Sequence, residues 1–132
     1  MASSRILVVD DDPNFLHFVT ELLIGAAYDA VGCSDPVRAS TMAQSFKPDL
    51  VILDLSMPGK DGFEVAQELR DDPKTKSARI LFLTAHRAAT HVKRAKAVGG
   101  AAYLEKPVPS ASLLWMVKAL LSTGPRRRAK AQ

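Results

Sequence analysis

The sequence predicts a doubly wound α/β fold, in which helices cover both faces of a single five-stranded parallel sheet. Short apolar runs alternate along the chain with longer segments that have the helical period of 3.6 residues. Three of the runs are only four residues long and rich in Ile, Leu and Val, which is typical of strands buried on both faces. They are Ile6–Val9, Leu50–Leu53 and Ile80–Leu83. With right-handed crossovers, the order βαβαβαβαβα gives a three-layer sandwich.

The first helix is predicted directly after the first strand. Its apolar residues recur at i, i+3, i+4, i+7 and i+8, a stripe that packs one helix face against a sheet. These residues are Phe15, Phe18, Val19, Leu22 and Leu23. A weaker apolar run, Tyr28–Gly32, predicts the second strand.

The second helix is predicted from a capping signal. Asp35 supplies a capping side chain, and Pro36 follows it in the first turn. The apolar residues behind it lie on one helix face: Ala39, Met42, Ala43 and Phe46. This helix should end near Lys47–Pro48, just before the strand at 50–53.

The third and fourth helices flank the strand at 80–83. Asp61–Gly62 opens the third, whose apolar positions are Phe63, Ala66 and Leu69. A hydrophilic stretch over 70–79, with Pro73, then leads back to the sheet. The fourth helix is predicted over 88–98 and stops at Gly99–Gly100.

The fifth strand and helix complete the pattern. The run Ala101–Leu104 predicts the strand, and Ser110–Leu121 predicts the helix. The helix should bury Leu113, Val117, Leu120 and Leu121. Trp115 and the neighbouring leucines give it more apolar surface than one face requires, which indicates a partner or dimer contact.

Length and charge set the domain organisation. A chain of 132 residues is one ordinary domain, and 47% hydrophobic with 24% charged residues is typical of a globular protein rather than a disordered one. The formal charge of +4 comes entirely from the segment after 123, which carries Arg126, Arg127, Arg128 and Lys130 but no acid. We therefore expect a folded, formally neutral domain over 1–123 and a basic tail or linker over 124–132.

The remaining composition predicts a cytoplasmic protein. Cys33 is the only cysteine, so no disulfide can form within the chain. The longest strongly apolar run, Leu113–Val117, is far shorter than the roughly 20 residues that span a bilayer. The first residues show no signal-peptide pattern, and no membrane association is expected.

Charged and polar residues gather where the predicted strands end. Ligands of such sheets bind at the carboxyl ends of the strands. The residues at this edge are Asp10, Asp11 and Asp12 after the first strand, Asp54 after the third, Thr84 at the end of the fourth, and Lys106 after the fifth. Converging carboxylates require a neutralising cation, and oxygen ligands favour Mg²⁺ or Mn²⁺.

This edge has the chemistry for handling phosphate. A carboxylate acts as a nucleophile towards phosphorus when cationic groups offset the charge of the transferred oxygens. Asp54 is the best candidate, because it follows the most apolar strand. Lys106 would supply a positive charge, and Thr84 a hydroxyl donor. Each residue also has an ordinary structural interpretation: aspartates that cap helices or turns, a surface lysine and a β-branched strand residue.

Four motifs resemble the receiver domain of two-component response regulators, the CheY-like family. They are ILVVDDDP (6–13), PDLVILDLSMPGKDG (48–62), LFLTA (81–85) and YLEKP (103–107), and the similarity extends over roughly residues 5 to 122. The resemblance implies a flavodoxin-like (βα)5 fold and a receiver domain over 1–123. It also implies two-component signal transduction by a phosphoprotein that is not an enzyme, although it assists its own phosphorylation and dephosphorylation.

The resemblance assigns roles to individual residues at the metal site. Asp11 would bind Mg²⁺ directly, and Asp10 mainly through water. Asp54 would be both phosphoacceptor and metal ligand, and the main-chain carbonyl of Ser56 the third ligand. Ser56 and His86 would border the water that attacks the phosphate.

The remaining roles concern the response to phosphorylation. Lys106 would bind the phosphate, Thr84 would be the switch hydroxyl and Tyr103 the switch aromatic, and Lys106–Pro107 would be a cis peptide. Phosphate would come from the phosphohistidine of a histidine kinase or phosphotransfer protein. The surface formed by the fourth helix, fifth strand and fifth helix would then meet an unknown output partner, or a second copy in a homodimer.

Parts of the sequence are also compatible with two other functions. A Mg²⁺-dependent phosphohydrolase of the haloacid-dehalogenase type would use Asp10 as its nucleophile, but Pro13–Asn14 departs from that family's motif and the length leaves no room for a cap domain. Nucleic-acid binding through Arg126–Arg128 is not expected of this chain alone, because a short basic run is more often a solvated tail.

Overall fold

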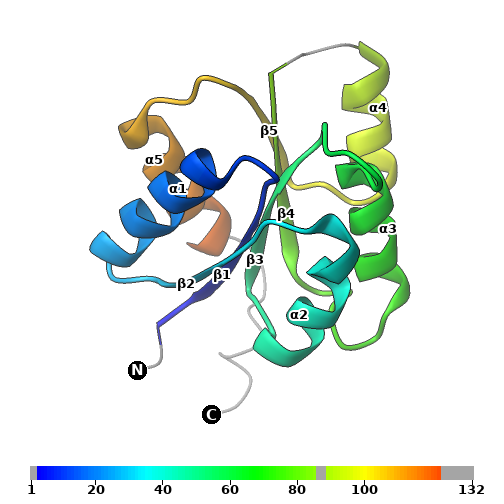
Figure 1. The fold of residues 1–132 in the computed structure, drawn as a ribbon, viewed down its shortest axis with the longest axis horizontal. Coiled ribbons are helices and arrows are strands. Elements are labelled where there is room, and N and C mark those ends of the chain that lie inside the picture. Colours follow the sequence, from blue (N-terminus) through cyan, green and yellow to red (C-terminus); the bar gives the residue numbers. More distant parts are fainter. Residues whose placement is uncertain (1–2, 86–88, 123–132) are drawn as a thin grey trace.

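The computed structural model describes residues 3–85 and 89–122, which form one parallel sheet between two layers of helices (Figure 1). The strands are β1 (Arg5–Val9), β2 (Asp29–Cys33), β3 (Leu50–Asp54), β4 (Arg79–Thr84) and β5 (Ala102–Glu105). The helices are α1 (Pro13–Gly25), α2 (Ala39–Phe46), α3 (Gly62–Asp71), α4 (Ala89–Ala97) and α5 (Ser110–Ser122), with a 3₁₀ turn at Pro36–Arg38. The predicted fold class and element order are confirmed.

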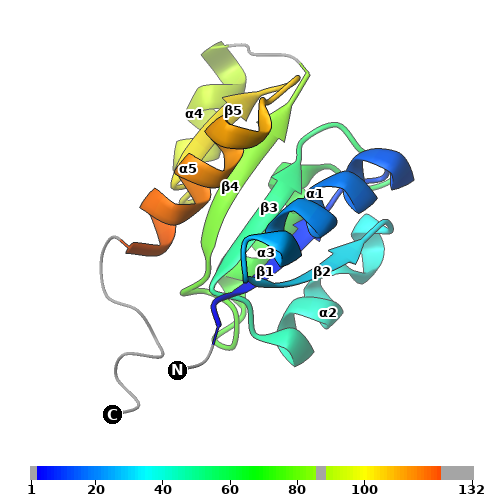
Figure 2. The same ribbon diagram turned by 90° about the vertical axis from the view of Figure 1, so that its left-hand side faces the viewer.

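The strand order is β2-β1-β3-β4-β5, and all neighbouring strands are parallel. Helices α1 and α5 cover one face of the sheet, and α2, α3 and α4 cover the other (Figures 1 and 2). The strand order reverses between β1 and β3. This reversal opens a crevice at the carboxyl ends of these two strands, the usual ligand site of such folds.

The central strands are buried on both faces, as predicted. On the α1 and α5 face, Ile6, Ile52 and Leu81 belong to one core cluster. On the opposite face, Leu7 and Leu53 belong to the other. A continuously apolar strand is stable only in the interior of the sheet, so these runs decide which strands are central.

Side-chain caps begin three of the helical segments. The Asp12 carboxylate accepts hydrogen bonds from the amides of Asn14 and Phe15 at the start of α1. The Asp35 carboxylate caps the 3₁₀ turn before α2. Asp61 and Glu64 form a capping box at α3. Such caps satisfy amides that have no partner within the helix, so element starts are encoded locally.

At most of the element ends that the structure describes, the observed first or last residue differs from the predicted one by one to three positions. Strand β2 and strand β5 each begin and end one residue later than predicted. Helix α4 begins at Ala89 and ends at Ala97, while Ala88 lies outside the described residues. The four predicted core positions of α5 are all buried.

Phe18 is the one exception in the predicted stripe of α1. It is 46% exposed, whereas Val19 and Leu23 are fully buried and Phe15 and Leu22 are partly buried. At about 100° per residue, Phe18 lies about 100° around the helix from Val19, on the flank of the face that meets the sheet. Its assignment to the packed face was therefore wrong.

Arg70 joins three elements at the amino-terminal edge of the sheet, opposite the crevice. Its guanidinium donates to the carbonyls of Val98 and Gly99 after α4, and to those of Lys76 and Ala78 before β4, at 2.7–3.1 Å. Carbonyls at a helix end lack partners within the helix. Arg70 satisfies them and fixes the end of α4 to α3 and β4.

Within the described part of the chain, no helix is both long enough and apolar enough to cross a membrane.

Candidate functional site

Three carboxylates meet in the crevice between β1 and β3. The register Val9↔Leu53 places Asp10 beside Asp54 at the carboxyl edge of the sheet. One carboxylate oxygen from each of Asp10, Asp11 and Asp54 lies within 4.8 Å of the others. Asp10 and Asp54 are 2% and 6% exposed, while Asp11 is exposed to solvent. The sequence prediction brought these residues to one edge, and the structure places their side chains together.

Lys106 brings an ammonium group to the same crevice. Its Nζ lies 2.8 Å from Asp10 Oδ2 and 3.5 Å from Asp54 Oδ1. The backbone of Lys106 is held at the end of the neighbouring strand, because its amide donates to the carbonyl of Thr84 at 2.6 Å. The Lys106–Pro107 peptide is cis, as the resemblance implied.

Burial and charge change the protonation of this cluster. Burial of the Asp54 carboxyl, reinforced by the nearby charge of Asp10, raises its pKa from the ordinary 3.8 to about 6, although Lys106 acts in the opposite direction. Burial alone would lower the pKa of Lys106, but its hydrogen bond to Asp10 and the two negative charges raise it. Lys106 therefore stays charged at neutral pH, and Asp54 carries negative charge that one ammonium does not fully compensate.

The donor set fits a hard divalent cation. Among the described residues, three clustered carboxylates against one ammonium leave an excess of negative charge, and the clustered donors are all oxygens. Both oxygens of Asp10 already accept hydrogen bonds, from Lys106 Nζ and from the Asp12 amide. Asp11 is exposed and Asp54 lies beside it, so these two have oxygens free of that network to face a cation.

The loop after Asp54 packs closely over the end of β3. Gly62, the first residue of α3, donates its amide to the carbonyl of Leu55 at 3.1 Å. A Cβ atom at Gly62 would lie only 2.4 Å from the carbonyl oxygen of Asp54, so this position requires glycine. Ser56 lies in this loop, two residues after Asp54, and is exposed.

Thr84 and Tyr103 lie on the face of the sheet that α3 and α4 cover. Thr84 is fully buried at the end of β4, and Tyr103 is partly buried on β5. Tyr103 is paired with Phe82 in the strand register and packs against the core beneath α3 and α4. Since side chains alternate along a strand, Thr84 and Tyr103 point to the same face. His86 lies outside the described residues.

Phe15 is a contact of the site that the sequence interpretation assigned only to the core. Its ring lies under Lys106 Nζ, 4.2 Å from the ring centroid. The available signal was its position, in the first turn of a helix that starts directly after the acidic cluster. Nothing in the sequence paired that ring with a lysine 91 residues away in the chain.

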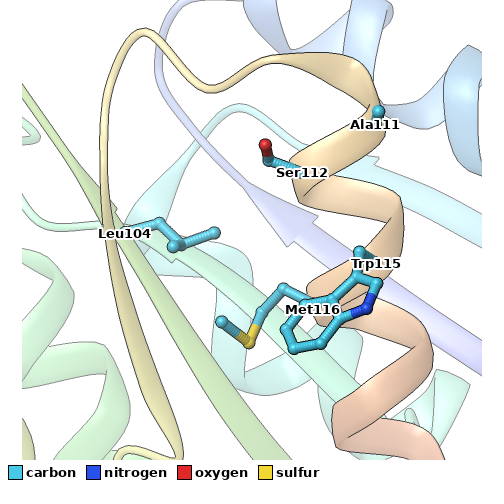
Figure 3. A pocket seen from close by; sticks show the side chains of 5 residues that line it. All are labelled: Leu104, Ala111, Ser112, Trp115 and Met116. Carbon is cyan, nitrogen blue, oxygen red and sulfur yellow. The ribbon is translucent and has the colours of Figure 1, made fainter.

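A second surface lies beside α5. Leu104 of β5 and Trp115 and Met116 of α5 line an open, mostly apolar pocket together with Ala111 and Ser112 (Figure 3). Trp115 is 69% exposed, in agreement with the expectation that α5 carries apolar surface beyond its packed face. The pocket contains none of the acidic residues of the crevice.

Comparison with known proteins gives the same family throughout. A family profile described as "Response regulator receiver domain" matches residues 6–118. Two similar curated proteins are the DNA-binding dual master transcriptional regulator RpaA of Synechocystis sp., 38% identical over 89% of this chain and 48% of RpaA, and Protein PilH of Pseudomonas aeruginosa, 30% identical over 90% of this chain and 98% of PilH. The chain thus spans about half the length of several curated relatives that it matches.

The fold comparison agrees with the sequence comparison. The structure of the chemotaxis protein CheY4 of Vibrio cholerae superposes with a TM-score of 0.87, at 30% identity, over 90% of this chain and 99% of CheY4. The profile covers most of the chain, and it includes both the acidic crevice and Lys106. The five-stranded sheet and its carboxylate cluster are therefore those of a response regulator receiver domain, the two-component family to which this chain belongs.

Proposed function

We propose that this domain accepts a phosphoryl group on Asp54 from the phosphohistidine of a histidine kinase or phosphotransfer protein. The observation that carries the proposal is the Asp54 carboxylate itself. It is nearly buried, its pKa is raised to about 6 by burial and by Asp10, and an ammonium group lies 3.5 Å away. A carboxylate that is held in place, ionised at neutral pH and faced by a cation is suited to attack phosphorus.

In this mechanism an oxygen of Asp54 forms a bond to phosphorus while the bond from phosphorus to the donor nitrogen breaks. Lys106 leaves its distant contact with Asp54 and meets a phosphoryl oxygen, while Asp10 keeps it at the crevice. A Mg²⁺ ion bound at the crevice would offset the charge that develops on the transferred oxygens. Asp11, Asp54 and the main-chain carbonyl of Ser56 would hold it, with Asp10 acting through water; Mn²⁺ has the same oxygen preference.

Phosphorylation of Asp54 would change the conformation of side chains on the sheet face that α4 covers. The phosphoryl oxygens would draw the Thr84 hydroxyl towards Asp54, and Tyr103 would occupy the space that Thr84 leaves. Both side chains lie on the face covered by α4, and Tyr103 is on β5. The surface of α4, β5 and α5 would then meet an output partner or a second copy of the chain. The apolar pocket at Trp115 lies on this surface.

The proposal for this chain is limited to the receiver step in the cytoplasm. RpaA is named as DNA-binding, but the chain covers only 48% of RpaA. We assign no nucleic-acid contact to the described residues. Residues 124–132, proposed as a basic tail or linker after the receiver domain, lie outside the described part of the chain.

The proposal is tested by incubating the protein with acetyl phosphate and Mg²⁺. The expected product is a labile acyl phosphate that Asp54→Asn abolishes, detected by mass spectrometry. Asp10→Asn should take up phosphate on Asp54 more slowly but still form the acyl phosphate, because Asp10 only holds Lys106 and the metal. An aspartate-nucleophile phosphohydrolase would instead depend on Asp10 and turn over acetyl phosphate after Asp54 is replaced. No label on the wild-type protein would contradict the proposed function.

A further inference from the structure

Among the described residues, two acids and one aromatic ring lie beside the Lys106 ammonium. Asp10 Oδ2 is 2.8 Å away and Asp54 Oδ1 is 3.5 Å away, while the ring face of Phe15 lies beneath the nitrogen at 4.2 Å. A cation within about 6 Å of a ring centroid is attracted by the negative face of the ring. The ring therefore contributes to where the ammonium lies.

Phe15 is connected to the crevice by its backbone as well. The Asp12 amide donates to Asp10 Oδ1 at 2.9 Å. The Asp12 carboxylate in turn accepts from the amide of Phe15 at 3.4 Å. The Phe15 ring contacts Lys106, and Lys106 in turn pairs with Asp10. These contacts and the two hydrogen bonds therefore link Asp10, Asp12, Phe15 and Lys106 in a closed ring of interactions. The position of the ring is thereby fixed relative to the carboxylates.

A lysine needs this kind of support more than most residues do. Its side chain is long and flexible, and holding it in one rotamer costs conformational entropy. The Lys106 side chain is still 20% exposed, so solvent competes for its ammonium. An aromatic face attracts a cation electrostatically and does not demand a hydrogen bond in one fixed direction, which leaves the ammonium able to turn between oxygen acceptors.

We propose that Phe15 is a positioning residue for phosphoryl transfer: its ring holds the Lys106 ammonium at the crevice, ready to meet the phosphoryl oxygens. This inference rests on the proposed function. Phe15 acts through Lys106 and touches no reacting atom. As Lys106 turns from Asp54 towards the phosphoryl group, the ring remains a neighbour that requires no fixed hydrogen-bond direction.

The test replaces Phe15 by phenylalanines carrying one, two or three ring fluorines, introduced site-specifically. Fluorine nearly preserves the shape of the ring while it weakens the negative charge of its face. The rate of Asp54 phosphorylation by acetyl phosphate in saturating Mg²⁺ is expected to fall stepwise with fluorination, by about twofold to thirtyfold in total. Phe15→Tyr should retain the rate, and Phe15→Leu should lose as much as the most fluorinated ring.

Phe18 supplies the comparison: it lies one turn along the same helix, it is 46% exposed, and its ring packs against that of Phe15 with 6.4 Å between the centroids. The same fluorinated series at Phe18 should leave the rate unchanged. If Phe15→Leu lowers the phosphorylation rate but the fluorinated variants at position 15 all keep the wild-type rate, Phe15 has a purely structural role and the inference is overturned. Equal rates for all Phe15 variants would also overturn it.

A second readout separates this inference from the proposed function. In nuclear magnetic resonance spectra, the ring current of Phe15 should shift the ε-methylene protons of Lys106 upfield, and Phe15→Leu should remove that shift. If wild-type protein takes no phosphate, the proposed function fails, and the spectra still show whether the ring holds the ammonium. If phosphorylation occurs but the Lys106 chemical shifts are the same in wild type and Phe15→Leu, only the positioning role fails.

Discussion

Two partly buried cations, Lys106 and Arg70, lie at opposite edges of the sheet and have different kinds of partner. Lys106 faces the carboxylates of Asp10 and Asp54, and its pKa is raised by them despite burial. Arg70 donates to four main-chain carbonyls, and burial lowers its pKa. Among the described residues, no carboxylate pairs with Arg70.

The difference shows that the residues for phosphate chemistry and the residues that stabilise the fold lie at opposite edges of the sheet. A lysine beside carboxylates is a mobile point charge that can exchange one oxygen for another. A guanidinium that binds several backbone carbonyls is a fixed cross-link, because it ties together the segments that carry those carbonyls. The carboxyl edge is therefore built for reaction, and the amino edge for holding α3, β4 and α4 together.

The largest expected effect is on reaction, at Lys106. We expect Lys106→Met to lower the rate of Asp54 phosphorylation by acetyl phosphate by about 10² to 10³, since one preorganised donor to a developing anion is worth that much. The rate should be measured well below the melting temperature, because the change also leaves Asp10 without its ammonium. Lys60→Met is the control, since Lys60 pairs with Glu68 instead of the crevice. Equal losses in both variants would contradict the assignment.

Arg70→Ala should lower the stability of the fold and leave the phosphorylation rate nearly unchanged. Removing the guanidinium leaves carbonyls at the end of α4 and before β4 without donors, so we expect the free energy of unfolding to fall by about 2–4 kcal/mol. Urea denaturation measures this, and the phosphorylation rate per folded molecule should stay near the wild-type value. Lys76→Ala, which removes an exposed side chain from the same region, should change stability by less than about 0.5 kcal/mol. A large loss of phosphorylation rate in Arg70→Ala would contradict the assignment of Arg70 to stability alone.

The raised pKa of Asp54 predicts a cost in stability that depends on pH. In protein kept metal-free with a chelator, the folded state holds the Asp54 proton up to about pH 6, whereas the unfolded chain releases it near 3.8. Stability should therefore fall as the pH rises through this window. Asp54→Asn removes the buried charge, so above the window it should be more stable than wild type by up to about 3 kcal/mol.

Thermal unfolding at several pH values in the presence of chelator measures this effect. Asp71→Asn serves as the comparison, because Asp71 is an exposed carboxylate at the end of α3. At neutral pH its stability should lie within about 0.5 kcal/mol of the wild type. An Asp54→Asn variant that is less stable than wild type at neutral pH would show that Lys106 outweighs the burial of Asp54.

The smallest effects concern the backbone beneath the site. Gly62→Ala would place a Cβ atom 2.4 Å from the carbonyl oxygen of Asp54, so we expect a loss of about 1–3 kcal/mol as the loop shifts. Gly25→Ala is the matched substitution, since a Cβ there meets nothing within 4 Å. It should raise stability by about 0.4–1 kcal/mol. Chemical denaturation of both variants would reveal whether the chain at Asp54 is as tightly fixed as the structure indicates.

Local sequence signals are sufficient to predict the order of elements and the edge at which the chemistry lies. Four-residue apolar runs define buried strands, and Asp35 and Asp61 mark helix starts, because both signals act within a few residues along the chain. Parallel strands bring their carboxyl ends to one side. The sequence alone therefore predicts that Asp10, Asp54 and Lys106 lie together, as they do in the structure.

Only the tertiary structure decided which side chains meet across elements and how deeply each is buried. The ring of Phe15 beneath Lys106, the exposure of Phe18 and the four carbonyls of Arg70 depend on helix rotation and loop course. The raised pKa of Asp54 depends on desolvation, which arises when distant segments exclude water. Local pattern encodes the elements, but contact and solvent exclusion are properties of the assembled fold.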